Sequence, residues 1–514
     1  MGGYNATTWL LDRHVEEGRY ARTAIRSAGS ALTYGELQGE TFRAQHALDG
    51  LGIAAGDRVV LVVNDEPAFP AWFLGAMRAG VVPVAVSTML TADDLAAIVA
   101  DAGARGVVVS SAFADHLGRI TTTATSVEHA VVIGGASADV GVPVHGWDDF
   151  DDRTELPTSD TGADSPAFWL YSSGTTGLPK GVVHRHAGPQ ATADTYANGV
   201  LRITEDDRCL SVAKLFFAYG LGNSLTFPFA VGATAILCPD RPTPAGMVEL
   251  VETERPTLFF ASPGFVAALL DTDAPADAFA SVRATVTAGE ALPADLHRRF
   301  TERFGHPVLD GIGSTEALHI FISNTLEAQH AGTSGWTVPG YEARLLDDAG
   351  EEVVAPDTPG YLHVRGPSIS SGYWERPEAT AAAFLPDGWL RTGDVYTRGE
   401  DDTWTFLGRN NDMIKAGGIW VSPAEVESVL VEHPDVLEAA VVGDRNEAGL
   451  EAVVAFVVPR AGCEIDPAAI DAHCRARMAS FKRPRRVVVV DNLPRTTTGK
   501  VRRFALREQL VGTV

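Results

Sequence analysis

The feature that most constrains the fold is an apolar run that leads directly into a loop of small and hydroxyl-bearing residues. The run, Ala167-Phe-Trp-Leu-Tyr171, is typical of a short buried strand. Residues 172–177 contain only Ser, Gly and Thr, and Lys180 follows shortly afterwards. Gly174 and Gly177 let the backbone turn and approach a ligand closely. Backbone amides, hydroxyl groups and one lysine in close succession predict a phosphate-binding loop.

Two other interpretations fit this loop less well. A Walker A loop requires Gly-Lys-[Ser/Thr] after four residues, but Pro179 stands five residues after Gly174. A flexible Ser/Gly linker is the alternative from composition alone. A linker would not usually follow a buried strand directly, or end in Pro-Lys-Gly before two apolar residues. The loop therefore favours phosphate binding.

Strand-like apolar runs alternate with helical patterns around this loop. Before it, apolar runs at residues 58–63 and 81–86 flank a helical pattern at residues 69–79. This alternation is typical of parallel α/β layers. A second such block is expected from the phosphate loop to about Asn324, and the short alternating runs after it indicate a small β-rich subdomain. A new set of helix and strand patterns begins near Asn411.

We therefore expect an α/β fold with two domains. The large N-terminal domain, residues 1–409, would contain two layered α/β subdomains and the β-rich subdomain. A small, mobile α+β domain would follow at residues 410–514. A chain of 514 residues is too long for a single ordinary core, which supports this division.

The composition, with 45% hydrophobic and 21% charged residues, is that of a soluble globular protein. A formal net charge of −25 argues against nucleic acids and anionic membranes as partners. No stretch approaches about 18 uninterrupted apolar residues, and the N-terminus lacks a signal-peptide pattern. The four cysteines lack CxxC spacing, which suggests neither a zinc site nor a disulfide framework and fits a reducing compartment. We expect a cytoplasmic protein, either a monomer or a homodimer.

The phosphate-binding loop resembles the signature of a known enzyme superfamily. Its sequence, Tyr171-Ser-Ser-Gly-Thr-Thr-Gly-Leu-Pro-Lys-Gly181, is similar to that of the adenylate-forming (AMP-binding) superfamily. That superfamily includes acyl-CoA and aryl-CoA ligases, peptide-synthetase adenylation domains and luciferases. Further motifs follow the family's order over nearly the whole chain. Three segments most resemble the benzoate–CoA ligases: Ala213-Lys-Leu-Phe-Phe-Ala-Tyr-Gly-Leu-Gly-Asn223, Asp310-Gly-Ile-Gly-Ser-Thr-Glu316 and Leu318-His-Ile-Phe321.

The resemblance implies a reaction in two steps. A carboxylate is a poor electrophile, because its charge is delocalised and its oxygens leave poorly. Attack of the carboxylate on the α-phosphate of ATP gives an acyl adenylate, from which a thiol then displaces AMP. The first step needs charge neutralisation around the phosphates, a site for adenosine and a pocket for the acid. ATP and CoA are therefore the expected cosubstrates, and Mg²⁺ the expected metal.

The resemblance also implies which residues bind ATP. Glu316 would ligate Mg²⁺ and Thr315 would contact the α-phosphate, with a surface Thr-Glu pair as the alternative. Asp394 and Arg409 would recognise the ribose, although Asp394 alone would be interpreted as part of a turn. The expected ATP-binding residues are Ser172, Ser173, Gly174, Thr175, Thr176, Gly177, Lys180, Gly289, Glu290, Asp310, Gly311, Asp394 and Arg409.

A pocket for the acid is expected around an aromatic segment. By itself, Leu215-Phe-Phe-Ala-Tyr-Gly220 is more typical of a hydrophobic core. A short helix could bring His319 and Ile320 to the same cleft and complete a flat apolar slot, which suits an aryl ring. A hydrogen-bonded core histidine is the alternative for His319. By resemblance to the benzoate–CoA ligases, the pocket residues are Phe217, Ala218, Tyr219, Gly220, Ala288, Gly313, His319 and Ile320.

Lys500 occupies the position of the family's catalytic lysine, in Pro494-Arg-Thr-Thr-Thr-Gly-Lys500. That lysine bridges the carboxylate and the α-phosphate, whereas an ordinary loop lysine would be solvated. In the family the C-terminal domain then rotates and opens a pantetheine tunnel. The expected CoA and hinge residues are Asn411, Lys415, Gly417 and Gly418. Asn411 stands where the family usually has Asp or Lys. Since Asn tolerates unusual φ values, we expect the C-terminal domain still to rotate. The sequence does not decide whether the equilibrium between the two domain orientations is the usual one.

Basic residues gather at 482–486 and 500–503 in this otherwise acidic chain. A solvated face and an anion site for a nucleotide or a CoA phosphate explain these clusters equally well.

These observations predict an ATP-dependent aryl-CoA ligase, an acid–thiol ligase that releases AMP and pyrophosphate. Its substrate would be benzoate or another small aromatic carboxylic acid. The alternative is a stand-alone aryl adenylation enzyme that loads a carrier-protein phosphopantetheine, which presents the same thiol arm as CoA. A non-catalytic nucleotide-binding or ligand-sensing protein fits less well, because Lys500, Glu316 and Asp394 are all present. A serine hydrolase is disfavoured, since the sequence lacks GxSxG.

Overall fold

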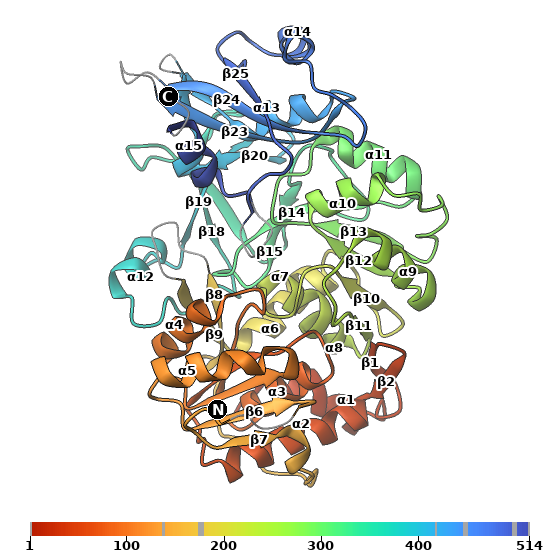
Figure 1. Cartoon of the computed structure of the whole chain (residues 1–514), viewed down its shortest axis with the longest axis vertical. Coiled ribbons are helices and arrows are strands. Elements are labelled where there is room, and N and C mark those ends of the chain that lie inside the picture. Colours follow the sequence, from red (N-terminus) through yellow and green to blue (C-terminus); the bar gives the residue numbers. More distant parts are fainter. Residues whose placement is uncertain are drawn as a thin grey trace.

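The computed structural model describes residues 3–135, 139–172, 179–416, 419–445, 451–495 and 501–511. These residues form an α/β fold with four β-sheets (Figure 1). Two large sheets and a small antiparallel sheet belong to the N-terminal part, and a further sheet forms the C-terminal part, drawn in blue. The predicted fold class is confirmed. Within these ranges, no helix is both long and apolar enough to cross a bilayer.

The first sheet has seven strands in the order β7-β6-β5-β3-β4-β8-β9. Its strands are β3 (Arg58–Val62), β4 (Val82–Ala85), β5 (Gly106–Ser110), β6 (His129–Ile133), β7 (Val144–Gly146), β8 (Pro166–Ser172) and β9 (Lys180–Arg185). Its helices are α2 (Tyr34–Gly50), α3 (Ala68–Arg78), α4 (Ala92–Ala102) and α5 (Leu117–Thr123). Val59 and Leu61 pack into one buried cluster, and Val60 and Val62 pack into another. Both faces are therefore covered, which explains the unbroken apolar runs.

The second sheet has nine strands in the order β16-β15-β14-β13-β12-β10-β11-β1-β2. Its strands are β1 (Thr23–Ser27), β2 (Ser30–Thr33), β10 (Arg208–Ser211), β11 (Thr234–Leu237), β12 (Leu258–Ala261), β13 (Ala284–Thr287), β14 (Val308–Gly313), β15 (Ile320–Ser323) and β16 (Trp336–Thr337). Its longer helices are α9 (Pro244–Glu254), α10 (Pro263–Leu270) and α11 (Ala294–Phe304). Shorter ones are α1 (Arg13–Glu16), α6 (Ala187–Thr192), α7 (Ala218–Leu221) and α8 (Phe227–Val231).

The expected division of the chain into two large α/β blocks differs from the observed sheets in two places. The second block was expected to begin at the phosphate loop, but β8 and β9, which flank that loop, belong to the first sheet. Trp169 and Leu170 of β8 pair in parallel with β4, and β9 turns back antiparallel to β8. Conversely, β1 near the N-terminus pairs with β11 and extends the second sheet. Hydrogen-bond pairing, rather than order along the chain, decides which strands share a sheet.

The β-rich subdomain predicted after the second sheet is a four-stranded antiparallel sheet. Its strands, in spatial order, are β17 (Glu342–Leu346), β18 (Gly360–Arg365), β19 (Leu390–Arg398) and β20 (Trp404–Arg409), and helix α12 (Pro377–Ala383) lies between β18 and β19 in the chain. Asp394 lies within β19 and pairs with Arg409 of β20. The alternative interpretation of Asp394 as a turn residue is therefore wrong.

The C-terminal part contains a five-stranded sheet with two hydrophobic clusters. Its strands are β21 (Ile414–Ala416), β22 (Ile419–Val421), β23 (Val436–Arg445), β24 (Glu451–Pro459) and β25 (Arg486–Val489). Its helices are α13 (Pro423–Val431), α14 (Pro467–Arg477) and α15 (Arg503–Val511). The predicted helices and strands are present to within a few residues. The domain boundary after residue 409 and the mobility of this part remain predictions.

Candidate active site

Ser172 and Lys180 mark the two ends of the predicted phosphate-binding loop. They are register partners at the loop end of the β8–β9 hairpin, so the loop connects two antiparallel strands. Lys180 is therefore the first residue of a strand, which ties its backbone to the first sheet. The remaining predicted loop residues, Ser173, Gly174, Thr175, Thr176 and Gly177, lie outside the described residues.

Lys180 and Glu316 both contact one tyrosine side chain, that of Tyr373. The Oη of Tyr373 donates a hydrogen bond to Oε1 of Glu316 over 2.8 Å. The Nζ of Lys180 lies 4.9 Å from the centre of the Tyr373 ring. Tyr373 was not among the predicted site residues, because its contacts depend on a fold that no local sequence pattern around it reveals.

Thr315 and Glu316 lie in the connection between β14 and β15. This connection forms turns and bends at residues 314–319, so the short helix expected to carry His319 is wrong. The reason is the close approach of the two strands. A Cβ atom at Gly313 would lie 2.4 Å from the carbonyl oxygen of His319, and Leu318 adopts a left-handed conformation with φ of 66°.

Asp310 is a buried carboxyl group beside the predicted adenosine segment. The Oγ1 of Thr287 donates to Oδ1 of Asp310 over 2.8 Å. Burial raises the pKa of Asp310 to about 7, although hydrogen bonds from Thr287 and from the amides of Leu292 and Gly311 oppose this shift. These bonds tie Asp310 to the two chain segments on either side of the predicted adenine slot.

Two further predicted residues flank this slot. Gly289 has φ of +98°, a conformation that other residues rarely adopt. Glu290 follows it directly and is an acceptor for the Nη1 of Arg495 over 3.3 Å. A segment of the C-terminal part therefore reaches the predicted adenosine site.

Asp394 and Arg409 face each other across β19 and β20. The Nε of Arg409 lies 3.1 Å from Oδ1 of Asp394, and its Nη1 donates to the carbonyl oxygen of Thr392 over 3.0 Å. The negative charge of Asp394 raises the pKa of Arg409. The structure thus brings together the two residues predicted to recognise ribose and orders both of them by mutual contact.

His319 is buried in a group of aromatic rings. Its ring centre lies 4.4 Å from that of Phe227 and 5.5 Å from that of Tyr219. Its Nε2 lies 3.1 Å from Oδ1 of Asn223, a residue at the end of the aromatic segment. Burial lowers the pKa of His319 to about 3, so the imidazole is neutral at physiological pH. The alternative of a hydrogen-bonded core histidine is therefore confirmed, and the contact of His319 with an aryl substrate stays a prediction.

The other predicted pocket residues surround this group. Tyr219, Ala288 and Ile320 belong to the same buried cluster, and the Oη of Tyr219 donates to the carbonyl oxygen of Val286 over 3.0 Å. Ala218 and Phe217 pack at the edge of the neighbouring cluster. The predicted aryl residues therefore lie where the cores of the two large sheets meet. Gly220 is required there, because a Cβ atom would lie 2.0 Å from the carbonyl oxygen of Lys214.

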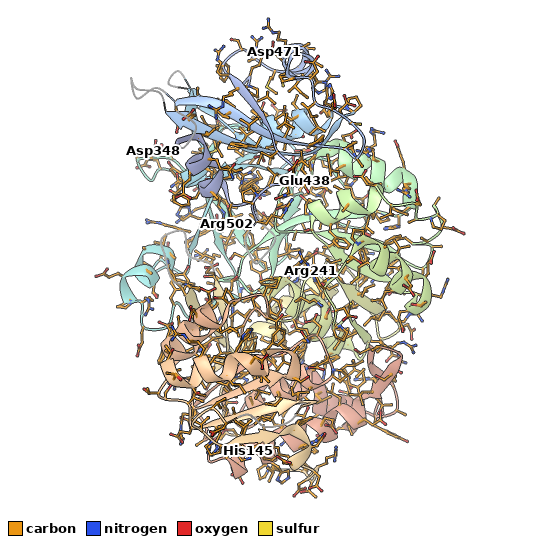
Figure 2. The ribbon with its side chains drawn as sticks, in the orientation of Figure 1. His145, Arg241, Asp348, Glu438, Asp471 and Arg502 are labelled. Carbon is orange, nitrogen blue, oxygen red and sulfur yellow. The ribbon has the colours of Figure 1, made fainter. Side chains whose placement is uncertain are left out.

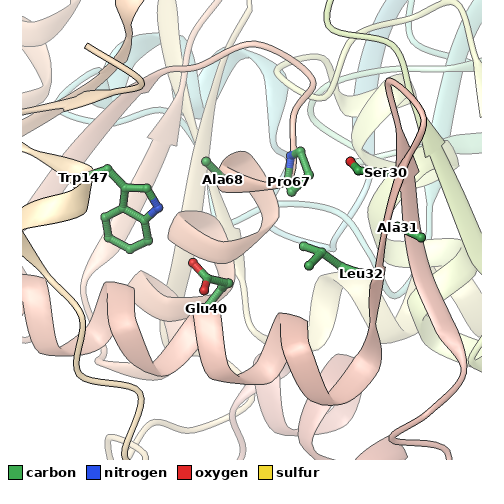
Figure 3. Close-up of a pocket in the computed structure, with 7 residues that line it drawn as sticks. All are labelled: Ser30, Ala31, Leu32, Glu40, Pro67, Ala68 and Trp147. Atoms are coloured by element: carbon green, nitrogen blue, oxygen red, sulfur yellow. The ribbon is translucent and has the colours of Figure 1, made fainter.

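A cavity of about 260 Å³ lies elsewhere in the molecule and contains none of the predicted site residues. Its lining residues are Ser30, Ala31, Leu32, Glu40, Pro67, Ala68 and Trp147 (Figure 3). The carboxylate of Glu40 is paired with Arg43 and Arg153, which leaves the cavity without an unpaired charge from this residue.

Arg495 connects the C-terminal sheet to the predicted ATP site. In addition to Glu290, it contacts Oε2 of Glu438 over 2.8 Å. Glu438 lies where the C-terminal sheet approaches α10 and α11 (Figure 2). Arg495 also pairs with Val501 through a β-bridge, so the two ends of the predicted catalytic loop lie together. Lys500 itself lies outside the described residues.

The predicted hinge begins directly after β20. Asn411 lies in the short turn Asn410–Asp412, and its carbonyl oxygen accepts a hydrogen bond of 3.5 Å from Nη2 of Arg507. Arg507 also contacts Oδ1 of Asp412 over 2.7 Å. Lys415 follows in β21, whereas Gly417 and Gly418 lie outside the described residues.

Comparison with known proteins agrees with this arrangement. A family model described as AMP-binding enzyme matches residues 11–374, and its C-terminal-domain counterpart matches residues 425–500. A benzoate–CoA ligase of Thauera aromatica is 44% identical, over 98% of this chain and 96% of its own length. A solved benzoate CoA ligase from Burkholderia xenovorans LB400 has a TM-score of 0.90 and 41% identity, over 98% of this chain and 100% of its own. A solved anthranilate CoA ligase in complex with anthranoyl-AMP has a TM-score of 0.94 and 34% identity, over 100% and 99% of the two chains. The chain therefore belongs to the AMP-binding enzyme family, in the branch that contains the benzoate–CoA ligases.

Proposed function

We propose that this protein is an ATP-dependent aryl-CoA ligase that activates benzoate or a substituted benzoate. The observation that carries the proposal is the 44% identity to a benzoate–CoA ligase over 98% of the chain. In the first step a carboxylate oxygen attacks the α-phosphorus of ATP and pyrophosphate leaves. In the second step the CoA thiol loses its proton and attacks the acyl carbon, and AMP leaves.

The phosphate groups would be held from two sides. The β8–β9 loop with Lys180 would bind them from the first sheet, and Thr315 would contact the α-phosphate from the β14–β15 turn. Asp394 and Arg409 would hold the ribose, and the segment at Gly289 would cover the adenine. The contacts of Tyr373 with Lys180 and with Glu316 support one shared site for the phosphates and the metal.

Glu316 is the residue that would hold Mg²⁺. Among the described residues, no group of three or more His, Cys, Asp or Glu side chains could hold a metal ion. Mg²⁺ is usually bound by one or two carboxylates together with substrate phosphates and water, so the Glu316 carboxylate would suit Mg²⁺ that enters with ATP. When bound, Mg²⁺ supplies positive charge that offsets the charge of the phosphates.

The aryl ring would lie against the aromatic group around His319. Because its pKa is lowered to about 3 by burial, His319 stays neutral and adds no charge that would compete with Lys500 for the carboxylate. An apolar slot discriminates a single methyl or hydroxyl substituent by only about 1–3 kcal/mol. We therefore expect several benzoates to be accepted, with unsubstituted benzoate among them.

The C-terminal part, residues 410–514, would act as a mobile domain that carries Lys500. Arg495 of this part contacts Glu290 beside the predicted adenosine site. This contact supports a domain orientation in which Lys500 would lie near the α-phosphate, as adenylation requires. Rotation at Asn411 would then bring the segment at Lys415, Gly417 and Gly418 towards the site for the reaction with CoA.

The basic residues 482–486 offer a place for a CoA phosphate. Lys482 is paired with Glu425 over 2.5 Å, whereas Nε of Arg483 is buried without a hydrogen-bond partner in the described part of the chain. A solvated face explains these basic residues equally well.

The direct test is AMP release from ATP and Mg²⁺ with a panel of acids, with and without CoA. The panel would contain benzoate, hydroxybenzoates, aminobenzoates and short alkyl acids, with products identified by mass spectrometry. We expect CoA-dependent formation of aroyl-CoA. Formation of an aryl adenylate that ignores CoA would instead indicate transfer to a carrier-protein phosphopantetheine. If no acid supports AMP release, the ligase proposal is wrong.

A further inference from the structure

Tyr373 lies between the two charged side chains that the proposed function assigns to the metal–nucleotide complex. Its hydroxyl donates to Oε1 of Glu316 over 2.8 Å, and its ring faces Nζ of Lys180 at 4.9 Å. We propose that Tyr373 is a positioning residue that fixes the Glu316 carboxylate and the Lys180 ammonium group relative to each other. This inference rests on the proposed function, since it concerns the same nucleotide site.

The backbone around Tyr373 is bonded to both elements that carry these charged groups. The amide of Ser370 donates to the carbonyl oxygen of Glu316 over 2.8 Å. Three backbone hydrogen bonds then join the segment to β9: Ser371 N to Val183 O (2.9 Å), Val183 N to Gly372 O (3.0 Å) and Trp374 N to Gly181 O (2.8 Å). The segment therefore joins the strand that begins at Lys180 to the turn that contains Glu316.

Neighbouring side chains hold this segment in place. The ring of Trp374 lies 4.5 Å from that of Trp169 in β8. Arg376 contacts Oδ1 of Asp101 over 2.5 Å, and Oη of Tyr171 donates to the other oxygen of the same carboxylate over 2.8 Å. The edge of Phe384 packs against Tyr373 at 5.3 Å. The tyrosine therefore has little freedom to follow a movement of Glu316, and a rigid donor sets the direction of its acceptor.

The chemistry of the hydroxyl suits this role. A tyrosine hydroxyl has one proton to donate, and here it donates to Oε1 of Glu316 over 2.8 Å. A donor to Oε1 limits rotation of the carboxylate and thereby directs its second oxygen. Groups that hydrogen-bond to a metal-binding side chain typically change metal affinity or activity by about 10–100-fold when they are removed.

The test measures nucleotide binding and needs no turnover. Calorimetry would give the affinity for α,β-methylene-ATP, with and without Mg²⁺, for the wild type, Tyr373→Phe and Tyr373→Leu. In Tyr373→Phe the ring beside Lys180 remains. We expect the gain in affinity that Mg²⁺ gives to fall about tenfold in this variant, while the metal-free affinity stays at the wild-type value. Tyr373→Leu should also weaken metal-free binding, because the ring beside Lys180 is lost.

A matched control removes a comparable hydroxyl away from the site. The Oη of Tyr361 donates to a carboxylate oxygen of Asp348 over 2.5 Å on an exposed surface. Tyr361→Phe should leave both affinities unchanged. The inference is overturned if Tyr373→Phe keeps the full Mg²⁺ effect, or if it weakens binding equally with and without Mg²⁺. This binding experiment contains neither aryl acid nor CoA, so its result does not depend on the ligase reaction. Failure of the ligase proposal would appear in the activity assay, as a wild type that binds the metal–nucleotide complex here but makes no aroyl-CoA there.

Discussion

At the scale of single residues, the buried carboxyl group of Asp310 should make the stability of the fold depend on pH. Asp310 is 5% exposed, and its hydrogen bonds join β13, β14 and the segment at Leu292. Burial raises its pKa to about 7 from an ordinary value near 3.8. Ionisation of this group therefore costs the folded state more than the unfolded state. The wild type should lose stability as the pH rises through the interval between these two values.

Asp310→Asn removes this titration and should change the pH dependence of unfolding. Between pH 5 and pH 8, the free energy of unfolding of the variant should rise relative to the wild type by about 2–3 kcal/mol. Urea unfolding of both proteins at the two pH values, followed by tryptophan fluorescence, would measure the difference. A difference that does not depend on pH would show that Asp310 is ionised in the folded protein throughout this range.

Asp207 provides the control for this experiment. Burial acts to raise the pKa of Asp207, but hydrogen bonds from Arg283 and Thr257 outweigh it and lower the pKa. This carboxyl is therefore ionised in both states between pH 5 and pH 8. Asp207→Asn should change the stability by the same amount at both pH values.

At the scale of elements, a short connection aligns the aromatic segment with the two large sheets. Leu215 donates its amide hydrogen to Oδ1 of Asp65 over 3.1 Å, directly after β3. On the other side, Nζ of Lys214 donates to the carbonyl oxygen of Asp240 over 2.7 Å, just after β11. The segment that leads into α7 is therefore anchored to the first sheet and to the second.

Asp65→Ala should weaken binding of the aryl acid more than binding of ATP. The variant leaves the buried amide of Leu215 without its acceptor, which costs about 1–3 kcal/mol. We expect the KM for benzoate to rise by roughly tenfold and the KM for ATP to change by less than about twofold, given that cost. Pyrophosphate release would measure both constants. Asp65→Asn keeps an acceptor and should restore most of the loss; an Asn variant as impaired as the Ala variant would contradict the anchoring role.

The elements themselves could be predicted well, because local patterns determine them. The valine-rich strands and the capping box at Thr33 and Glu36 depend on nearby residues alone. Membership of β8 and β9 in the first sheet could not be predicted, since it depends on pairing with β4, far away in the chain. The turn at 314–319 was missed because it depends on the close approach of Gly313 to the backbone of His319. Such a contact leaves no periodic pattern of apolar residues in the sequence. Tyr373 was missed for the same reason.

At the scale of the whole molecule, ion pairs connect the C-terminal part to the rest of the chain. Arg460, just after β24, contacts Asp271 after α10 over 2.8 Å, and Arg495 contacts Glu290 over 3.3 Å. Asp271 is 39% exposed at its side chain, so its pair is worth at most about 1 kcal/mol and is screened by salt. Small contributions of this size suit the proposed rotation of the C-terminal part, in which this interface would open.

Asp271→Asn should slow adenylation slightly and reduce its sensitivity to salt. The wild-type rate of pyrophosphate exchange should fall between low salt and 0.5 M KCl, by at most about fivefold if the pair contributes about 1 kcal/mol. The variant should start lower and fall less. Asp93→Asn removes the surface pair with Arg119, which is formed within the N-terminal part, and should behave like the wild type. Equal salt dependence in all three proteins would exclude a role for the Arg460–Asp271 pair.

We propose that one chain forms an aryl adenylate with Lys500 and then transfers the aroyl group to CoA. This proposal is tested most directly by measuring the two half-reactions separately in the wild type and in Lys500→Ala. With ATP, Mg²⁺ and benzoate, the variant should form benzoyl-AMP about 10²–10³ times more slowly than the wild type. With benzoyl-AMP and CoA supplied, both proteins should form benzoyl-CoA at similar rates. Normal adenylation by Lys500→Ala, or a wild type that makes no benzoyl-CoA from benzoyl-AMP, would contradict this proposal.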